Sequence, residues 1–295
     1  MSSTAGNPTR FGCRLIGVSG AALFLGLCLG PLVGSGLAQR GGAPADEEAV
    51  RPAPRWPDGH IRLDAPPGET GIWYGPGGPV PGLADRDDNP RPHPYPGRPK
   101  LSEVPFLPWA RAIYDYRDVN QFEPHARCKP SGGVRQFVTP YGNEIVEIPE
   151  LERVYIFDVG GPHSFRIIFT DGRGHPEDVK PSAYGHSIGW WEGDTLVVDT
   201  VGFNEEFWLD RRVAATTRQL HLIERFTRTS YDTIEYEVTV DDPGAYSRPW
   251  TSGLYLRWES DQEMFEYICQ EQNLAGDLMV GTQEESFFGN NRIIP

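Results

Sequence analysis

Lysine is scarce in this sequence. Only Lys100, Lys129 and Lys180 stand among 27 basic residues, and 41 acidic residues give the chain a net charge of −14. Such an excess of negative charge argues against nucleic acids and anionic membrane surfaces as partners. Because arginine supplies the rest of the positive charge, we interpret the shortage of lysine as genome composition.

Long hydrophobic runs are missing beyond the first 38 residues. Arg10 and Arg14 precede an uncharged apolar run over 15–37, and small residues lead up to Ala38. This pattern predicts a secretory signal peptide over 1–38 that is cleaved after Ala38. An uncleaved membrane anchor is the alternative. No later stretch is apolar enough to cross a bilayer, so we expect a periplasmic or secreted protein with no stable membrane insertion after cleavage.

Cysteine is nearly absent as well. Cys13 and Cys28 leave with the signal peptide, and Cys128 and Cys269 then remain as one pair. In an oxidising compartment such a pair most often forms a disulfide bond, which we predict here. Two unrelated buried thiols are the alternative. A catalytic thiol is disfavoured because no histidine motif accompanies either cysteine.

No amphipathic helix of ten residues separates the extended segments, which argues against a parallel α/β sheet. The extended segments instead follow one another in pairs joined by short turns, and the hairpin over 186–200 around Glu192-Gly193-Asp194 is the clearest. The ten predicted strands are 135–139, 144–148, 154–158, 165–170, 186–191, 195–200, 219–228, 233–241, 254–259 and 263–269. We predict a mainly β domain over 105–295, an antiparallel meander that closes into a lipocalin-like barrel. A two-sheet β-sandwich is the alternative.

Proline is concentrated in one region, since 14 of the 28 prolines fall within 39–100. Such a segment cannot join a helix or a central strand. We predict an extended, partly disordered Pro/Gly-rich arm over 39–104. Within it, 71–74 reads as a possible first strand near Trp73, with a Gly-X-Trp pattern that resembles the opening strand of lipocalin-like barrels. One short helix is predicted over 106–117.

Several motifs resemble a family of exported bacterial proteins that has no established activity. They include the hairpin signature HSIGxWEGDTLVVDTxGF over 186–203, the segment 169–176, and Cys128-Lys129-Pro130 followed by Arg135. The resemblance runs from about 105 to 273. It implies export and a shared fold, but it assigns no catalytic residue. Trp190 departs from the family pattern, which has arginine there.

Histidine is the residue type most open to a chemical role. Three of the seven histidines, His175, His186 and His221, lie in the densest motifs. Their spacing matches no compact metal motif, but three strands could bring them together on Zn²⁺ or Cu²⁺, with Asp199 or Glu224 as a fourth ligand. The same carboxylates could serve His186 or His221 in general acid–base catalysis. Strict alternation places His221 and Glu224 on opposite faces of one strand, which makes Glu224 the weaker candidate.

A structural role is the third interpretation of these polar residues. Buried histidines and acids in β domains commonly satisfy backbone groups. Asp199 interrupts an apolar strand and needs a partner if it is buried. Arg166 and Arg225 are the candidates for a structural ion pair with Asp199.

Three classes of function fit the sequence. The first is an exported β-barrel that binds a small, partly apolar molecule, because 8 Trp, 12 Tyr and 14 Phe suit a pocket for a ring-bearing or sugar-like ligand. The second is a hydrolase, hydratase, lyase or isomerase with a His–carboxylate pair in the barrel. The third is an interaction protein without a pocket that docks through the Pro-rich arm. No motif requires a cofactor.

Overall fold

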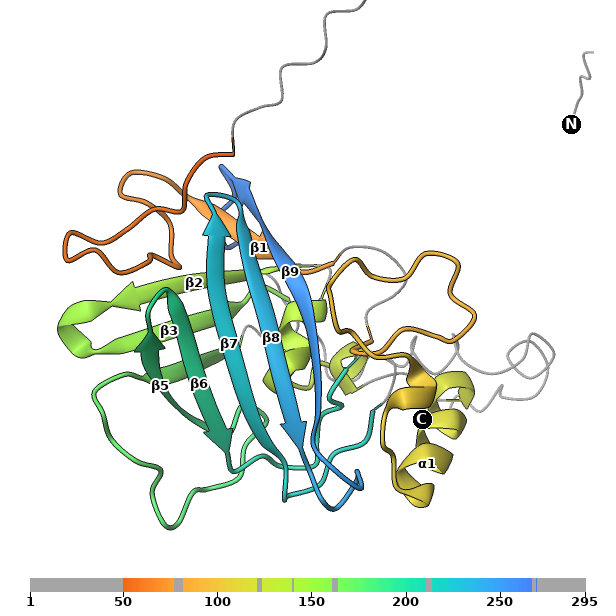
Figure 1. Cartoon of the computed structure of the whole chain (residues 1–295). Coiled ribbons are helices and arrows are strands. Elements are labelled where there is room, and N and C mark those ends of the chain that lie inside the picture. Colours follow the sequence, from red (N-terminus) through yellow and green to blue (C-terminus); the bar gives the residue numbers. More distant parts are fainter. Residues whose placement is uncertain are drawn as a thin grey trace, which may run out of the picture. The chain divides into compact units, whose positions relative to one another are not determined.

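A closed barrel of nine strands in chain order dominates the computed structural model (Figure 1). The structure describes residues 50–76, 82–120, 124–139, 141–160, 164–210, 214–266 and 269, so the predicted signal peptide lies outside the described residues. The strands are β1 (Gly71–Tyr74), β2 (Asn143–Ile148), β3 (Arg153–Asp158), β4 (Phe165–Phe169), β5 (His186–Glu192), β6 (Thr195–Val201), β7 (His221–Ser230), β8 (Thr233–Asp241) and β9 (Trp250–Ser260). The helical elements are η1 (Leu101–Glu103), α1 (Pro108–Asn120), η2 (Pro124–Arg127), η3 (Gly133–Val138) and η4 (Pro149–Leu151).

The order of the strands confirms the predicted barrel and corrects one detail of it. Each strand pairs with the next in antiparallel fashion, and β9 closes the ring on β1. The exception is β4 and β5, which are parallel and pair only at Ile168–Ser187 and Phe169–Ile188. A parallel pair needs a crossover connection, and residues 170–185 supply it. The barrel is therefore mixed rather than a pure antiparallel meander.

Alternation along the strands decides which side chains enter the barrel. In β7, Leu222, Glu224 and Phe226 are buried, whereas their neighbours are partly exposed. In β8 the same alternation buries every second residue from Ile234 to Val240. Because neighbouring side chains of a strand point to opposite faces, the buried set lies inside the barrel and the other set lies outside.

Inside the barrel lies η3, where the sequence predicted a strand over 135–139. That prediction is wrong. All six residues of η3 are buried, and Gly132 and Gly133 enter it with positive φ angles of 69° and 38°. The Phe137 ring contacts Phe226 of β7 and Tyr236 of β8, with centroids 5.5 and 4.7 Å apart. The segment is apolar enough for a strand, but it fills the interior instead of joining the wall.

The other predicted boundaries need smaller corrections. The last predicted strand, 263–269, is also wrong, because its described residues have no strand geometry. The strand before it, β9, is longer than predicted and pairs with both β8 and β1. The predicted helix over 106–117 is present as α1, two residues later at its start and three at its end. No helix among the described residues has the length and apolar character needed to span a membrane.

Parts of the Pro-rich arm pack on the barrel. Ile61, Leu63 and Leu83 are at most 2% exposed and belong to the main hydrophobic core. The predicted first strand is present as β1, and the indole of Trp73 donates a hydrogen bond to the Leu63 carbonyl at 3.0 Å. The predicted extended arm is therefore anchored at several points, because apolar residues between the prolines are buried.

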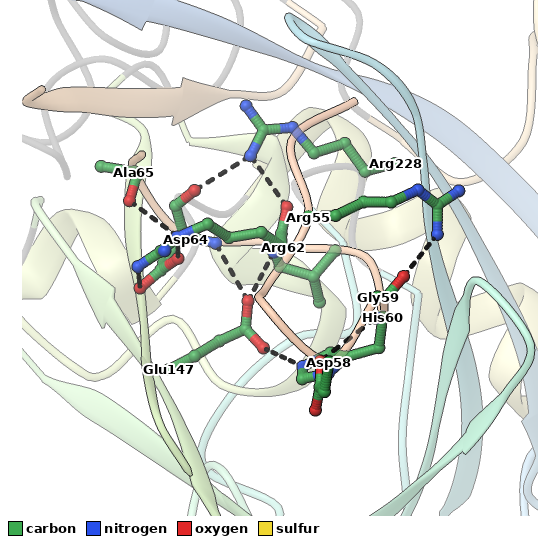
Figure 2. A network of polar contacts seen from close by, with 10 residues as sticks. Arg55, Asp58, Gly59, His60, Arg62, Asp64, Ala65, Glu147 and Arg228 are labelled. Carbon is green, nitrogen blue, oxygen red and sulfur yellow. Dashed lines mark hydrogen bonds and ion pairs between the residues drawn. The ribbon is translucent and has the colours of Figure 1, made fainter. Parts of the chain in front are cut away.

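Two buried charges of the barrel hold this arm in place (Figure 2). The Arg228 guanidinium donates to the carbonyl oxygens of Arg62 and Asp64, both at 2.9 Å. The Glu147 carboxylate accepts the backbone N–H of Leu63 at 2.5 Å and that of Asp64 at 3.3 Å. Burial lowers the pKa of Arg228 to about 10 and raises the pKa of Glu147. The barrel thus satisfies backbone groups that a segment without secondary structure cannot pair by itself.

The predicted disulfide bond between Cys128 and Cys269 is present. The two Cα atoms lie 5.6 Å apart, although 141 positions separate them in the sequence. The bond joins the chain just after η2 to the segment beyond β9, which fits an oxidising compartment.

Candidate functional site

The structure places three predicted site histidines and one predicted carboxylate side by side. His175 comes from the crossover between β4 and β5, His186 begins β5, Asp199 lies on β6 and His221 begins β7. The Nδ1 atoms of His175 and His186 are 2.8 Å apart. Oδ1 of Asp199 lies 3.1 Å from Nε2 of His175 and 2.8 Å from Nε2 of His221. We call these four residues the histidine cluster.

The histidine cluster lies on the outer face of the barrel. Alternation turns Ser187 of β5 and Leu222 of β7 inward, so His186 and His221 point outward. The histidine cluster is partly solvent-exposed, with 20% of the His175 side chain and 36% of the His221 side chain accessible. The expected His–carboxylate pair inside the barrel is therefore not formed by His186 or His221, and the two histidines do not lie on adjacent strands. β6 separates them, and Asp199 of β6 contacts His221 directly and His186 only through His175.

The hydrogen bonds of the histidine cluster fix its proton arrangement. A carboxylate oxygen only accepts, so the Nε2 atoms of His175 and His221 carry the protons that they share with Asp199. The Nδ1 atoms of His175 and His186 share one proton, and the tautomers of the two rings decide which of them donates it. This chain runs from Asp199 through His175 to His186 and leaves Nε2 of His186 with no protein partner among the described residues. Burial, followed by the electrostatic influence of His175 and Arg173, lowers the pKa of His186.

Ring contacts hold His186 from its other side. Its imidazole stacks on the Phe169 ring, with centroids 5.4 Å apart and an interplanar angle of 21°. The Arg173 guanidinium lies 4.1 Å from the centroid of that same Phe169 ring. Arg173 is itself paired with Asp171, with Nε 2.8 Å from Oδ1. Phe169 at the end of β4 and Arg173 of the crossover thus pack beside His186 and restrict its ring.

Glu224, the remaining predicted site residue, is not part of the histidine cluster. It lies inside the barrel, where its Oε1 accepts hydrogen bonds from Arg166 Nη1 at 2.9 Å and from the Tyr236 hydroxyl at 2.8 Å. Arg166 also donates to Ser187 and Thr200, at 3.0 and 2.9 Å. All five side chains are buried, so this network is an internal ion pair.

The ion pairs differ from those expected from the sequence. Arg166 binds Glu224, and Arg225 binds Glu192 at 2.9 Å. Asp199 therefore takes histidines as partners instead of either arginine. Across the part of the chain that the structure describes, no group of three or more His, Cys, Asp and Glu side chains is arranged to hold a metal ion. The expected convergence of all three histidines on one ion is not formed, because Asp199 lies between His175 and His221.

A second candidate site, which the sequence did not reveal, lies beside the end of α1. It is a hollow of about 440 Å³, and its lining residues are Arg117, Pro124, Arg127, Lys129, Glu205, Glu206 and Trp208. We call it the α1 pocket. Its only sequence signal is that three basic side chains come from nearby segments of an acidic chain.

Arg117 and Trp208 give the α1 pocket its chemical character. The Arg117 guanidinium lies 4.9 Å from the Trp208 ring centroid, and the Trp208 side chain is buried. Burial lowers the pKa of Arg117, and no charged neighbour offsets it. Within the described residues Arg117 has no carboxylate partner, whereas Glu205 lies 3.5 Å from Arg218. The pocket therefore presents a partly desolvated cation on an aromatic surface, and this cation has no carboxylate partner within the described part of the chain.

Comparisons of this chain with protein-family models, with curated proteins and with solved structures found no match.

Proposed function

We propose that this protein binds a small organic anion with an apolar ring in the α1 pocket. The observation that carries the proposal is the half-buried guanidinium of Arg117, which faces the Trp208 ring without a carboxylate partner. Taking a charged group out of water is unfavourable unless an opposite charge compensates it. A carboxylate or phosphate on a ligand would supply that charge, and guanidinium binds such groups through paired hydrogen bonds.

The size and lining of the α1 pocket fit the same ligand class. Its volume of about 440 Å³ lies within the range of small-molecule sites, about 300–1,000 Å³. Trp208 offers an apolar face for a ring, and Arg127 and Lys129 add further cationic groups to the lining. Glu205 and Glu206 at the same rim favour a ligand with little negative charge beyond one acidic group.

A ligand site inside the barrel has less support. η3 and the Arg166–Glu224 pair occupy the interior that a lipocalin-like protein would leave to its ligand. The ligand that we propose is small and partly apolar, as expected from the sequence, but it binds in the α1 pocket outside the barrel. Export of the protein is part of this proposal, supported by the disulfide bond between Cys128 and Cys269.

Isothermal titration calorimetry tests the proposal with 2-naphthoate and with neutral 2-naphthalenemethanol, which has the same ring but no charge. We expect 2-naphthoate to bind at least about tenfold more tightly, because a hydrogen bond to a charged group contributes about 1.5–3 kcal/mol. Arg117→Ala should remove that difference. Arg111→Ala is the matched control on the same helix, because Arg111 pairs with Asp115 at 2.9 Å, outside the α1 pocket.

Two results would contradict the proposal. One is equal affinity for the acid and the alcohol in the unaltered protein. The other is an unchanged affinity for 2-naphthoate in Arg117→Ala whose melting temperature matches that of Arg111→Ala. Inorganic phosphate as a third titrant shows whether the ring is needed, since a site for the charge alone would bind phosphate as well as naphthoate.

A further inference from the structure

We propose that the outward surface of β2, β3 and β4 is the contact surface of a two-fold dimer, with a second copy of this chain as the partner. This surface consists of every second residue of 144–148, 153–157 and 165–169, and we call it the β2–β4 face. It shares no residue with the α1 pocket, so the dimer does not depend on the ligand proposed there.

The β2–β4 face is apolar although solvent reaches it. Apart from Glu144 and Arg153 its residues are apolar or aromatic, and none of them is buried. Phe165 is the most open, at 52% exposed. The outward residues of β8 are instead Glu235, Glu237, Thr239 and Asp241. An apolar patch of this kind on an otherwise polar surface is typical of a protein–protein interface.

Three aromatic rings of the β2–β4 face pack against one another. The rings of Tyr155 and Phe157 on β3 have centroids 6.0 Å apart and an interplanar angle of 13°. Phe157 also lies beside Phe165 of β4, its register partner, with centroids 5.9 Å apart. Aromatic residues are enriched at the centres of interfaces. Rings that already restrict one another lose less freedom when a partner binds.

Glu144 and Arg153 are the two charged residues of the β2–β4 face, and neither has a partner of opposite charge among the described residues. The Arg153 guanidinium reaches the Tyr155 hydroxyl at 3.5 Å, and its Nε is buried without a hydrogen-bond partner. Burial, followed by the charge of Glu263, raises the pKa of Glu144. A cation brought close to Glu144 would therefore stabilise its carboxylate, and a carboxylate would do the same for Arg153.

The positions of these two charges make the β2–β4 face complementary to itself. Glu144 lies four residues from Ile148 along β2, and Ile148 is the register partner of Arg153. At about 3.4 Å per residue the two charges are about 14 Å apart along the sheet, which is too far for an ion pair within one molecule. A two-fold axis between them brings Glu144 of one copy opposite Arg153 of the partner subunit and repeats the contact in the other direction.

Sedimentation velocity tests the dimer, from about 1 to 500 µM protein in about 150 mM NaCl, where the screening length of about 8 Å limits repulsion between the acidic chains. Three short strands offer less surface than permanent dimers use, about 2,000 Å² or more, so we expect a dissociation constant in the micromolar range. Glu144→Arg and Arg153→Glu each place like charges opposite each other and should weaken association at least about tenfold. The double variant Glu144→Arg/Arg153→Glu exchanges the two charges and should restore association to within about threefold.

Glu235→Arg on β8 and Arg257→Glu on β9 are the matched controls, because they make the same changes of charge outside the β2–β4 face. Both should dimerise like the unaltered protein. A monomer over the whole concentration range would overturn the inference and leave the β2–β4 face to a different partner. Unchanged association in both single variants would overturn it too. So would a double variant that keeps the melting temperature of the unaltered protein but does not dimerise.

Discussion

The interior of this barrel contains a buried ion pair. Arg166 and Glu224 bind each other inside the barrel, and hydroxyl groups satisfy their remaining polar atoms. The desolvation of two buried charges can exceed their attraction unless such hydrogen bonds are complete. Removal of one partner leaves the other charge buried and uncompensated, which is more damaging than exchange of both for apolar residues.

Asp158 at the end of β3 is a buried carboxyl of a different kind. Its side chain is fully buried, and it accepts hydrogen bonds from Gly160 N–H and from the Tyr184 hydroxyl, both at 3.3 Å. Burial raises its pKa to about 6, despite hydrogen bonds and the charge of Arg135 that act in the opposite direction. The folded protein therefore holds a proton that the unfolded chain releases near pH 4.

We predict that Asp158→Asn removes a pH-dependent part of the stability. Because the folded pKa is the higher one, this contribution is present below about pH 4 and is lost as the pH rises through about 6. The difference in pKa, from about 4 to about 6, corresponds to about 3 kcal/mol. Urea unfolding at pH 4 and pH 7 measures this contribution. The free energy of unfolding of the unaltered protein, relative to that of the variant, should be higher at pH 4 than at pH 7 by about that amount. The prediction fails if the gap between the two proteins is the same at both pH values.

The sequence was informative about the faces of residues and less so about their partners. Alternation correctly placed His221 and Glu224 on opposite faces of β7, but the expected site had His221 inside the barrel, whereas it is Glu224 that lies there. The partner of Glu224 is Arg166 of β4, which depends on how β4 to β7 curve around the interior, and no local pattern shows that curvature. The α1 pocket was missed for the same reason, since Arg117 and Trp208 are 91 positions apart in the sequence and meet only in the fold.

Among the elements of the fold, η3 distinguishes this barrel from one with an empty interior, because η3 fills the space inside the ring of strands. Four of its six residues, 135–138, fall within a predicted strand, but the ring of nine strands is closed without them. η3 instead fills the interior, where Phe137 packs on the rings of Phe226 and Tyr236. The positive φ of Gly132 and Gly133 turns the chain toward them. Sequence patterns report that a segment is apolar and extended, but they do not report whether a partner strand is free.

We predict that Phe137→Ala in η3 lowers the free energy of unfolding by about 3–5 kcal/mol, the usual effect of removing a fully buried aromatic ring. The Phe137 side chain is 1% exposed and contacts Phe226 and Tyr236. Phe165→Ala on β4 is the control, because Phe165 is 52% exposed. Chemical denaturation of both variants makes the comparison. Equal losses in the two variants would show that η3 does not support the barrel.

The whole molecule depends on one covalent link between distant parts of the chain. Cys128 and Cys269 are 141 positions apart, and cross-linking a loop of that length restricts the unfolded chain by about 5 kcal/mol in the chain-entropy description. We predict a loss of that order in Cys128→Ala/Cys269→Ala, measured by urea unfolding. Dithiothreitol should reproduce the loss in the unaltered protein and leave the double variant unchanged. A reductant effect of equal size on both proteins would contradict this role of the bond.

The pairing of β1 also has a consequence for how the chain matures. β1 pairs with β2 only at Trp73–Asn143, but it pairs with β9 at four positions, where Trp73 meets Trp258. Residues 71–74 leave the ribosome long before 250–260 do. Until then β1 has almost no partner, and the open edges of the unfinished sheet stay available to other chains. The strand that is synthesised first can therefore complete its pairing only after the strand that is synthesised last.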